Sequence, residues 1–105
     1  MSEIQNKSVA LVTQIEGALA HLSPSDRALS FLEKSLDLYF ALGGSPDAAV
    51  ELVTQTRGGA RPRVEASVAN VVIELAAASH LSDIDMIQAA YNRLDVELAA
   101  PRAKR

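Results

Sequence analysis

The sequence contains no cysteine and no tryptophan, and aromatic residues make up only 4% of its 105 residues. Without cysteine the chain can form neither a disulfide nor a thiolate zinc site, and it has no cysteine nucleophile. A core with so few aromatic side chains has to be built from Leu, Val, Ile and Ala, which suits helix packing. Hydrophobic residues reach 49%, so we expect one small folded domain rather than a disordered chain.

A strong excess of charge is also missing. The formal net charge is −3, which gives no case for binding nucleic acid. Residues 1–8 lack the basic start and apolar run of a signal peptide. No stretch reaches the ~20 apolar residues that a membrane-spanning helix needs. We therefore expect a cytoplasmic protein that does not bind membranes.

Start and stop signals divide the chain into helices. Serine caps at 23, 45 and 82, each followed by proline or an acid, mark three starts. Glycine pairs at 43–44 and 58–59 mark two ends. The predicted helices cover residues 3–21, 24–42, 46–56, 63–80 and 83–99. No strand and no internal repeat is predicted.

These elements predict an all-α fold, an antiparallel helical bundle of about five helices. An N-terminal helix (1–22) packs on a helical core (23–99), and a flexible basic tail follows (100–105). Tyr39 and Phe40 are assigned to the core. The helices at 24–42 and 63–80 are apolar on more faces than one chain of this length covers. We therefore expect a homodimer or homotetramer, in which a second copy completes the bundle.

Each of these two helices carries a line of polar residues through its apolar sequence. The lines are Ser30, Glu33 and Asp37 on the first helix, and Ser67, Asn70 and Glu74 on the second. Spacings of three and four place each line on one helix face, and we expect the two lines to face each other. Oxygen-bearing side chains of this kind suit a hard cation such as Mg²⁺. The candidate metal ligands are Glu33, Asp37, Asn70 and Glu74; the alternative is a solvated or hydrogen-bonded face.

Basic residues lie beside these lines. Lys34 argues against a bound cation, and it also fits an ion pair with Asp37 or with an acid on a neighbouring helix. Arg57, Arg61 and Arg63 cluster in the loop between the third and fourth predicted helices. They fit a phosphate bound by forked hydrogen bonds, or a loop of solvated charges. The candidate substrate-binding residues are therefore Lys34 and these three arginines.

With the segments in this order, residues 23–95 resemble the MazG-like, all-α nucleoside triphosphate pyrophosphohydrolases. That family carries Glu-Glu-x-x-Glu on one helix and Glu-x-x-Asp on a later helix that continues into an apolar run. Residues 23–38 look like the first block, and residues 61–85 look like the second block with the turn that follows it. The resemblance implies carboxylates that hold Mg²⁺ around a triphosphate, which water cleaves to a monophosphate and pyrophosphate.

Carried over residue by residue, the resemblance implies a depleted site. Glu33, Lys34 and Asp37 stand where the family has three glutamates, and Ser67 and Asn70 stand where it has Glu and Asp. Two positions keep an acid, one is reversed in charge and two are neutral. A magnesium ion at a triphosphate needs carboxylates to offset its charge, so we expect catalysis to be lost or weak.

Three functions are compatible with this pattern. The leading one is a homo-oligomeric binding or regulatory protein, with a nucleotide as candidate ligand, no assigned catalytic residue and no cofactor. The second is an active Mg²⁺-dependent pyrophosphohydrolase with the rearranged ligands Glu33, Asp37 and Glu74. The third is a helical interaction module unrelated to nucleotides, in which the polar lines form interhelical hydrogen bonds.

Overall fold

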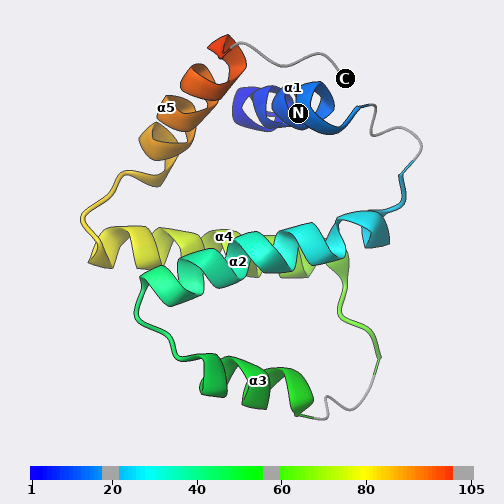
Figure 1. The fold of residues 1–105 in the computed structure, drawn as a ribbon, viewed down its shortest axis with the longest axis vertical. Helices are drawn as coiled ribbons and strands as arrows, with labels where there is room; N and C mark the ends of the chain where they lie inside the picture. The colour runs from blue at the N-terminus through cyan, green and yellow to red at the C-terminus, as the bar shows by residue number, and fades with distance from the viewer. Residues whose placement is uncertain (18–21, 56–59, 101–105) are drawn as a thin grey trace. The chain divides into compact units, whose positions relative to one another are not determined.

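The computed structural model describes residues 1–17, 22–55 and 60–100, and the regular structure in these ranges is entirely helical (Figure 1). The elements are α1 (Glu3–Glu16), η2 (Pro24–Arg27), α2 (Ala28–Ala41), α3 (Pro46–Thr54), α4 (Val64–Leu81) and α5 (Met86–Ala99). The all-α class is therefore confirmed for the described residues. Completion of a MazG-like bundle by a second copy stays a prediction.

Two helix starts differ from their predicted form. The serine cap at 23 opens a short 3-10 helix, in which the Ser23 amide donates to Asp26 Oδ2 at 2.7 Å, and α2 follows. The cap of α5 is Asp85 rather than Ser82, because Asp85 Oδ1 accepts the Gln88 amide at 2.8 Å. Helix α5 therefore begins three residues later than predicted. The third start is confirmed, since a serine at 45 caps α3.

Helix α1 ends earlier than predicted. Gly17, with φ of 90°, is its C-cap, and its amide donates to Thr13 O at 2.9 Å. A positive φ is tolerated by glycine because it has no Cβ, so the helix stops here. The predicted extension through residues 18–21 lies outside the described residues, as does the glycine stop at 58–59.

The α2–α3 and α4–α5 connections have the same backbone design. Gly43 and Asp83 are 40 residues apart and both have positive φ, 97° and 58°. The next helix is capped two residues later in each case, by Ser45 and by Asp85. The closing hydrogen bonds also correspond: Gly44 N to Tyr39 O at 3.0 Å, and Ile84 N to Ser79 O at 2.9 Å. The chain therefore contains two pairs of helices joined by equivalent turns, called the α2–α3 and α4–α5 hairpins for this turn alone, although the sequence predicts no repeat.

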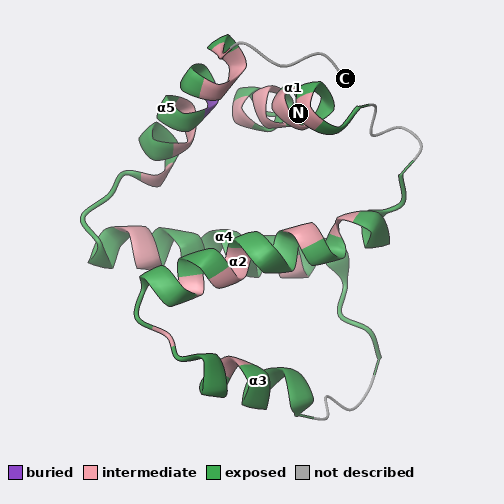
Figure 2. Ribbon diagram, in the orientation of Figure 1, coloured by how far each residue is buried: buried purple, intermediate pink, exposed green. Residues whose placement is uncertain are grey.

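The chain divides into two compact units, residues 1–21 with 69–105, and residues 22–68, so α4 belongs to both. In the first unit, α1 packs against α5 (Figure 1). Leu94 of α5 is 6% exposed and is the single buried residue of the described ranges (Figure 2). A fully buried leucine contributes about 1.5–3 kcal/mol to folding, so this packing is the core of the unit.

The unit of residues 22–68 has no buried residue among those described. Its turn is closed by Tyr39, whose hydroxyl donates to Ser45 O at 3.0 Å. The tyrosine ring lies against Gly44, where a Cβ atom would overlap it. Phe40 meets the same ring edge-on, with centroids 5.3 Å apart, but is 43% exposed. Its assignment to the core is therefore wrong for the chain by itself.

Candidate functional site

Glu33 and Asp37 of the α2 polar line are exposed, and Glu33 already forms an ion pair. Lys34 Nζ lies 3.8 Å from Glu33 Oε1, with side chains 75% and 73% exposed. The sequence suggests Asp37 as a partner of Lys34, whereas the structure pairs Lys34 with Glu33. Asp37 is exposed. An exposed ion pair contributes only ~0–1 kcal/mol to stability. Its effect on metal binding matters more, because the Lys34 ammonium group neutralises a carboxylate that a bound cation would need as a ligand.

The first residue of the α2 line is fixed by its own helix. Arg27 Nη2 donates to Ser30 Oγ at 3.4 Å, and the serine is half-buried. The contact joins the last residue of η2 to the first turn of α2. Ser30 therefore helps to connect two helical segments, because its hydroxyl oxygen accepts a hydrogen bond from Arg27.

The polar line of α4 is also in solvent. Asn70 and Glu74 are exposed, and Ser67 is half-buried in the first turn, where its amide donates to Arg63 O at 3.0 Å. No residue of α4 is buried, and Ile73 is 64% exposed. This exposure agrees with the expectation that one chain does not cover this helix on all its apolar faces, while the second copy that would cover it stays a prediction. Because Asn70 and Glu74 are exposed, no burial of these polar groups creates an energetic demand for a bound ion.

The candidate metal ligands of the two lines fall in different units. Glu33 and Asp37 belong to the unit of residues 22–68, and Asn70 and Glu74 belong to the other. The facing of the two lines therefore stays a prediction. Within the described ranges, no group of three or more His, Asp or Glu side chains is placed to hold a metal ion.

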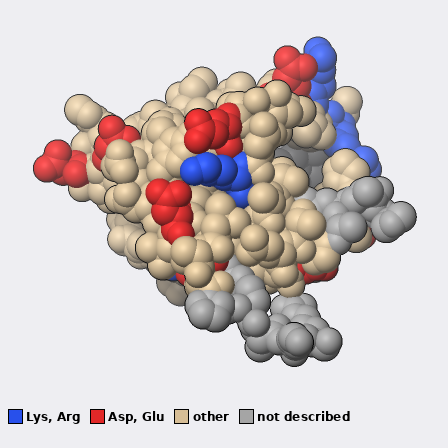
Figure 3. All heavy atoms as spheres, turned by 90° about the horizontal axis from the view of Figure 1, so that it is seen from above, with Lys and Arg blue, Asp and Glu red and all other residues tan. Residues whose placement is uncertain are grey.

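The candidate phosphate-binding arginines flank the start of α4. Arg61 and Arg63 are exposed and lie just before the first turn of that helix. Arg57 lies outside the described residues. On the face drawn in Figure 3, charged side chains form small groups separated by uncharged residues. Two exposed guanidinium groups beside a helix N-terminus suit an anion electrostatically.

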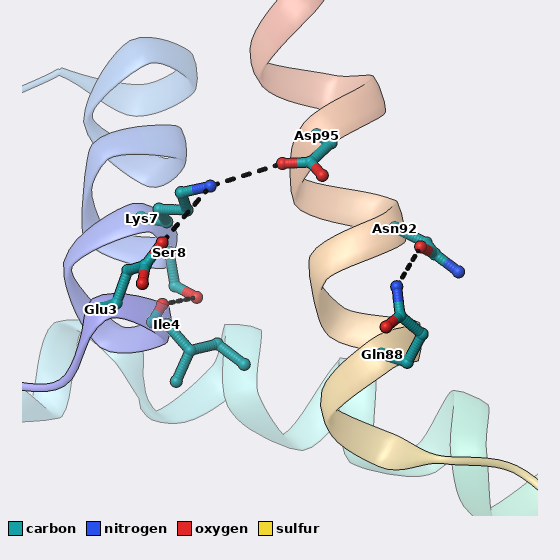
Figure 4. Close-up of polar contacts among 7 residues, drawn as sticks. All are labelled: Glu3, Ile4, Lys7, Ser8, Gln88, Asn92 and Asp95. Carbon is teal, nitrogen blue, oxygen red and sulfur yellow. Dashed lines mark hydrogen bonds and ion pairs between the residues drawn. The ribbon is translucent and has the colours of Figure 1, made fainter.

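A cluster in the first unit was not singled out from the sequence. Lys7 of α1 lies 5.3 Å from the centroid of the Tyr91 ring and 3.5 Å from Asp95 Oδ1; Figure 4 shows the Asp95 contact. Glu3 adds a second carboxylate, 3.8 Å from the same ammonium group. The usable signal was the spacing of Tyr91 and Asp95, which puts both on one face of α5. The cluster orients α1 on α5 and contains no nucleophile.

Helix α4 is the one described helix long and apolar enough, by length and composition, to cross a membrane. This differs from the sequence-based prediction, in which no stretch is long enough to span a membrane. Its 18 residues are at the short end of the spanning range, and Glu74 lies well inside them. A charged side chain near the middle of a bilayer costs about 2.5–3.5 kcal/mol on insertion scales.

No protein-family model matches the sequence, and neither curated proteins nor solved structures show a significant similarity to it. The MazG-like resemblance therefore depends on the two residue blocks and their order along the chain.

Proposed function

We propose that the protein is a homo-oligomeric helical binding protein on a MazG-like scaffold, in which pyrophosphohydrolase activity is lost or weak. The observation that carries the proposal is the exposure of apolar side chains along α2 and α4. Phe31 of α2 and Leu42, the C-cap residue of α2, are 55% and 53% exposed, and Val68 and Ile73 of α4 are 57% and 64% exposed. Helices with such surfaces are stable in water when another protein surface covers them.

The weakness of catalysis follows from charge. Relative to the resembled family, Lys34 in place of Glu changes the charge by two units, and Ser67 and Asn70 each remove one, about four units in all. The Glu33–Lys34 ion pair supports the same conclusion, because it neutralises one of the two acids that remain in the first block. Mg²⁺ binds through hard, negatively charged oxygens, so this set holds it poorly.

A nucleotide is the proposed ligand because the scaffold resembles nucleotide enzymes and basic residues flank the lines. Arg61 and Arg63 supply the forked donors that phosphate groups prefer. Binding without turnover would make the protein a sensor or carrier of nucleotides rather than an enzyme.

The test is calorimetric titration of the full chain with a panel of nucleoside triphosphates, with and without Mg²⁺ or Mn²⁺, together with a pyrophosphate-release assay. A triple variant restores the family's acids: Lys34→Glu, Ser67→Glu and Asn70→Asp. We expect tight Mg²⁺ binding in the triple variant and not in the parent.

A control variant lowers the net charge by the same amount, about four charge units, at exposed positions of α5. Its substitutions are Arg93→Glu, Gln88→Glu and Asn92→Asp. The control should not gain tight Mg²⁺ binding. Metal-dependent pyrophosphate release by the parent would favour the active hydrolase with Glu74 as a ligand. Nucleotide binding that is absent in every form would favour an interaction module.

A further inference from the structure

We draw no further inference here: the strongest candidate, the exposed apolar surface of α2 and α3 in the unit of residues 22–68, carries none, because nothing in the structure shows what covers it.

Discussion

The two hairpins of this chain share a turn and differ in what happens to their second helix. In the α4–α5 hairpin, α1 packs on α5 and buries Leu94 at 6% exposure. In the α2–α3 hairpin, the described residues reach no such burial, and Tyr39 closes the turn by reaching Ser45 O. The comparison teaches that a well-formed turn fixes a hairpin's local geometry, whereas a core needs a third element.

The largest expected effect comes from removing that core. Leu94→Ala should lower the free energy of unfolding by about 2–4 kcal/mol, because it leaves a cavity between α1 and α5. Val96→Ala, two residues further on and 67% exposed, should change it by less than about 0.5 kcal/mol. Urea unfolding at one fixed protein concentration measures both. Equal effects of the two substitutions would show that α1 does not bury Leu94.

The next effect concerns the closure of the first turn. Gly44→Ala should cost about 1–3 kcal/mol, because the new methyl group overlaps the Tyr39 ring and forces it away from Ser45. The equivalent position in the other hairpin is Ile84, which is 52% exposed, so Ile84→Ala should cost far less.

A double-mutant cycle sharpens this prediction. With Tyr39→Ala already present, Gly44→Ala should be nearly harmless, a coupling of roughly 0.5–3 kcal/mol. Thermal melts of the four proteins give the coupling. Strict additivity would mean that the ring and the glycine do not depend on each other.

The positive-φ positions of the two turns predict changes of opposite sign. Gly43→Ala places a Cβ at φ of 97° and should destabilise the protein by about 1–2 kcal/mol. Asp83→Gly removes the backbone strain of a non-glycine residue at φ of 58°. This change should stabilise the protein slightly, by less than about 1 kcal/mol. Differential scanning calorimetry on the two variants checks the signs. A stabilising Gly43→Ala would contradict the equivalence of the turns.

The smallest expected effect is electrostatic. Lys7→Met removes the ammonium group from Tyr91, Asp95 and Glu3 and should cost about 0.5–1 kcal/mol. The difference should shrink as salt is added, because partly exposed ion pairs are screened. Lys34→Met, at a 75% exposed lysine, is the control and should leave stability almost unchanged. A loss that does not respond to salt would point to packing by the lysine stem instead.

Much of the fold could be predicted from the sequence, because the relevant signals are local. The serine cap at 45 and the glycine at 43 act through backbone hydrogen bonds within a few residues, and the structure confirms both. The start of α5 was predicted wrongly, because Ser82 and Asp85 both look like caps. The choice depends on the positive φ of Asp83, which a sequence shows clearly only when glycine occupies the position.

The candidate site was less predictable, because it depends on long-range placement. The spacing of Glu33 and Asp37 correctly puts both on one helix, but the pairing of Lys34 with its immediate neighbour Glu33 is a matter of side-chain geometry. The contact of Lys7 with Asp95 joins residues far apart in the chain, and the local spacing of Tyr91 and Asp95 marks only the α5 side of it. Only the packing of α1 on α5 brings these side chains together.

That contact also has a kinetic consequence. Lys7 and Asp95 are 88 positions apart, so docking α1 on α5 closes a loop of nearly the whole chain, with a loop-closure term of about 4 kcal/mol beyond a constant. The two hairpins close over a few residues and should form early, whereas α1 should dock last. In native-state hydrogen exchange, the amides of α1 should therefore lose protection before those of the hairpin turns. The docking of α1 is then the step that completes the fold.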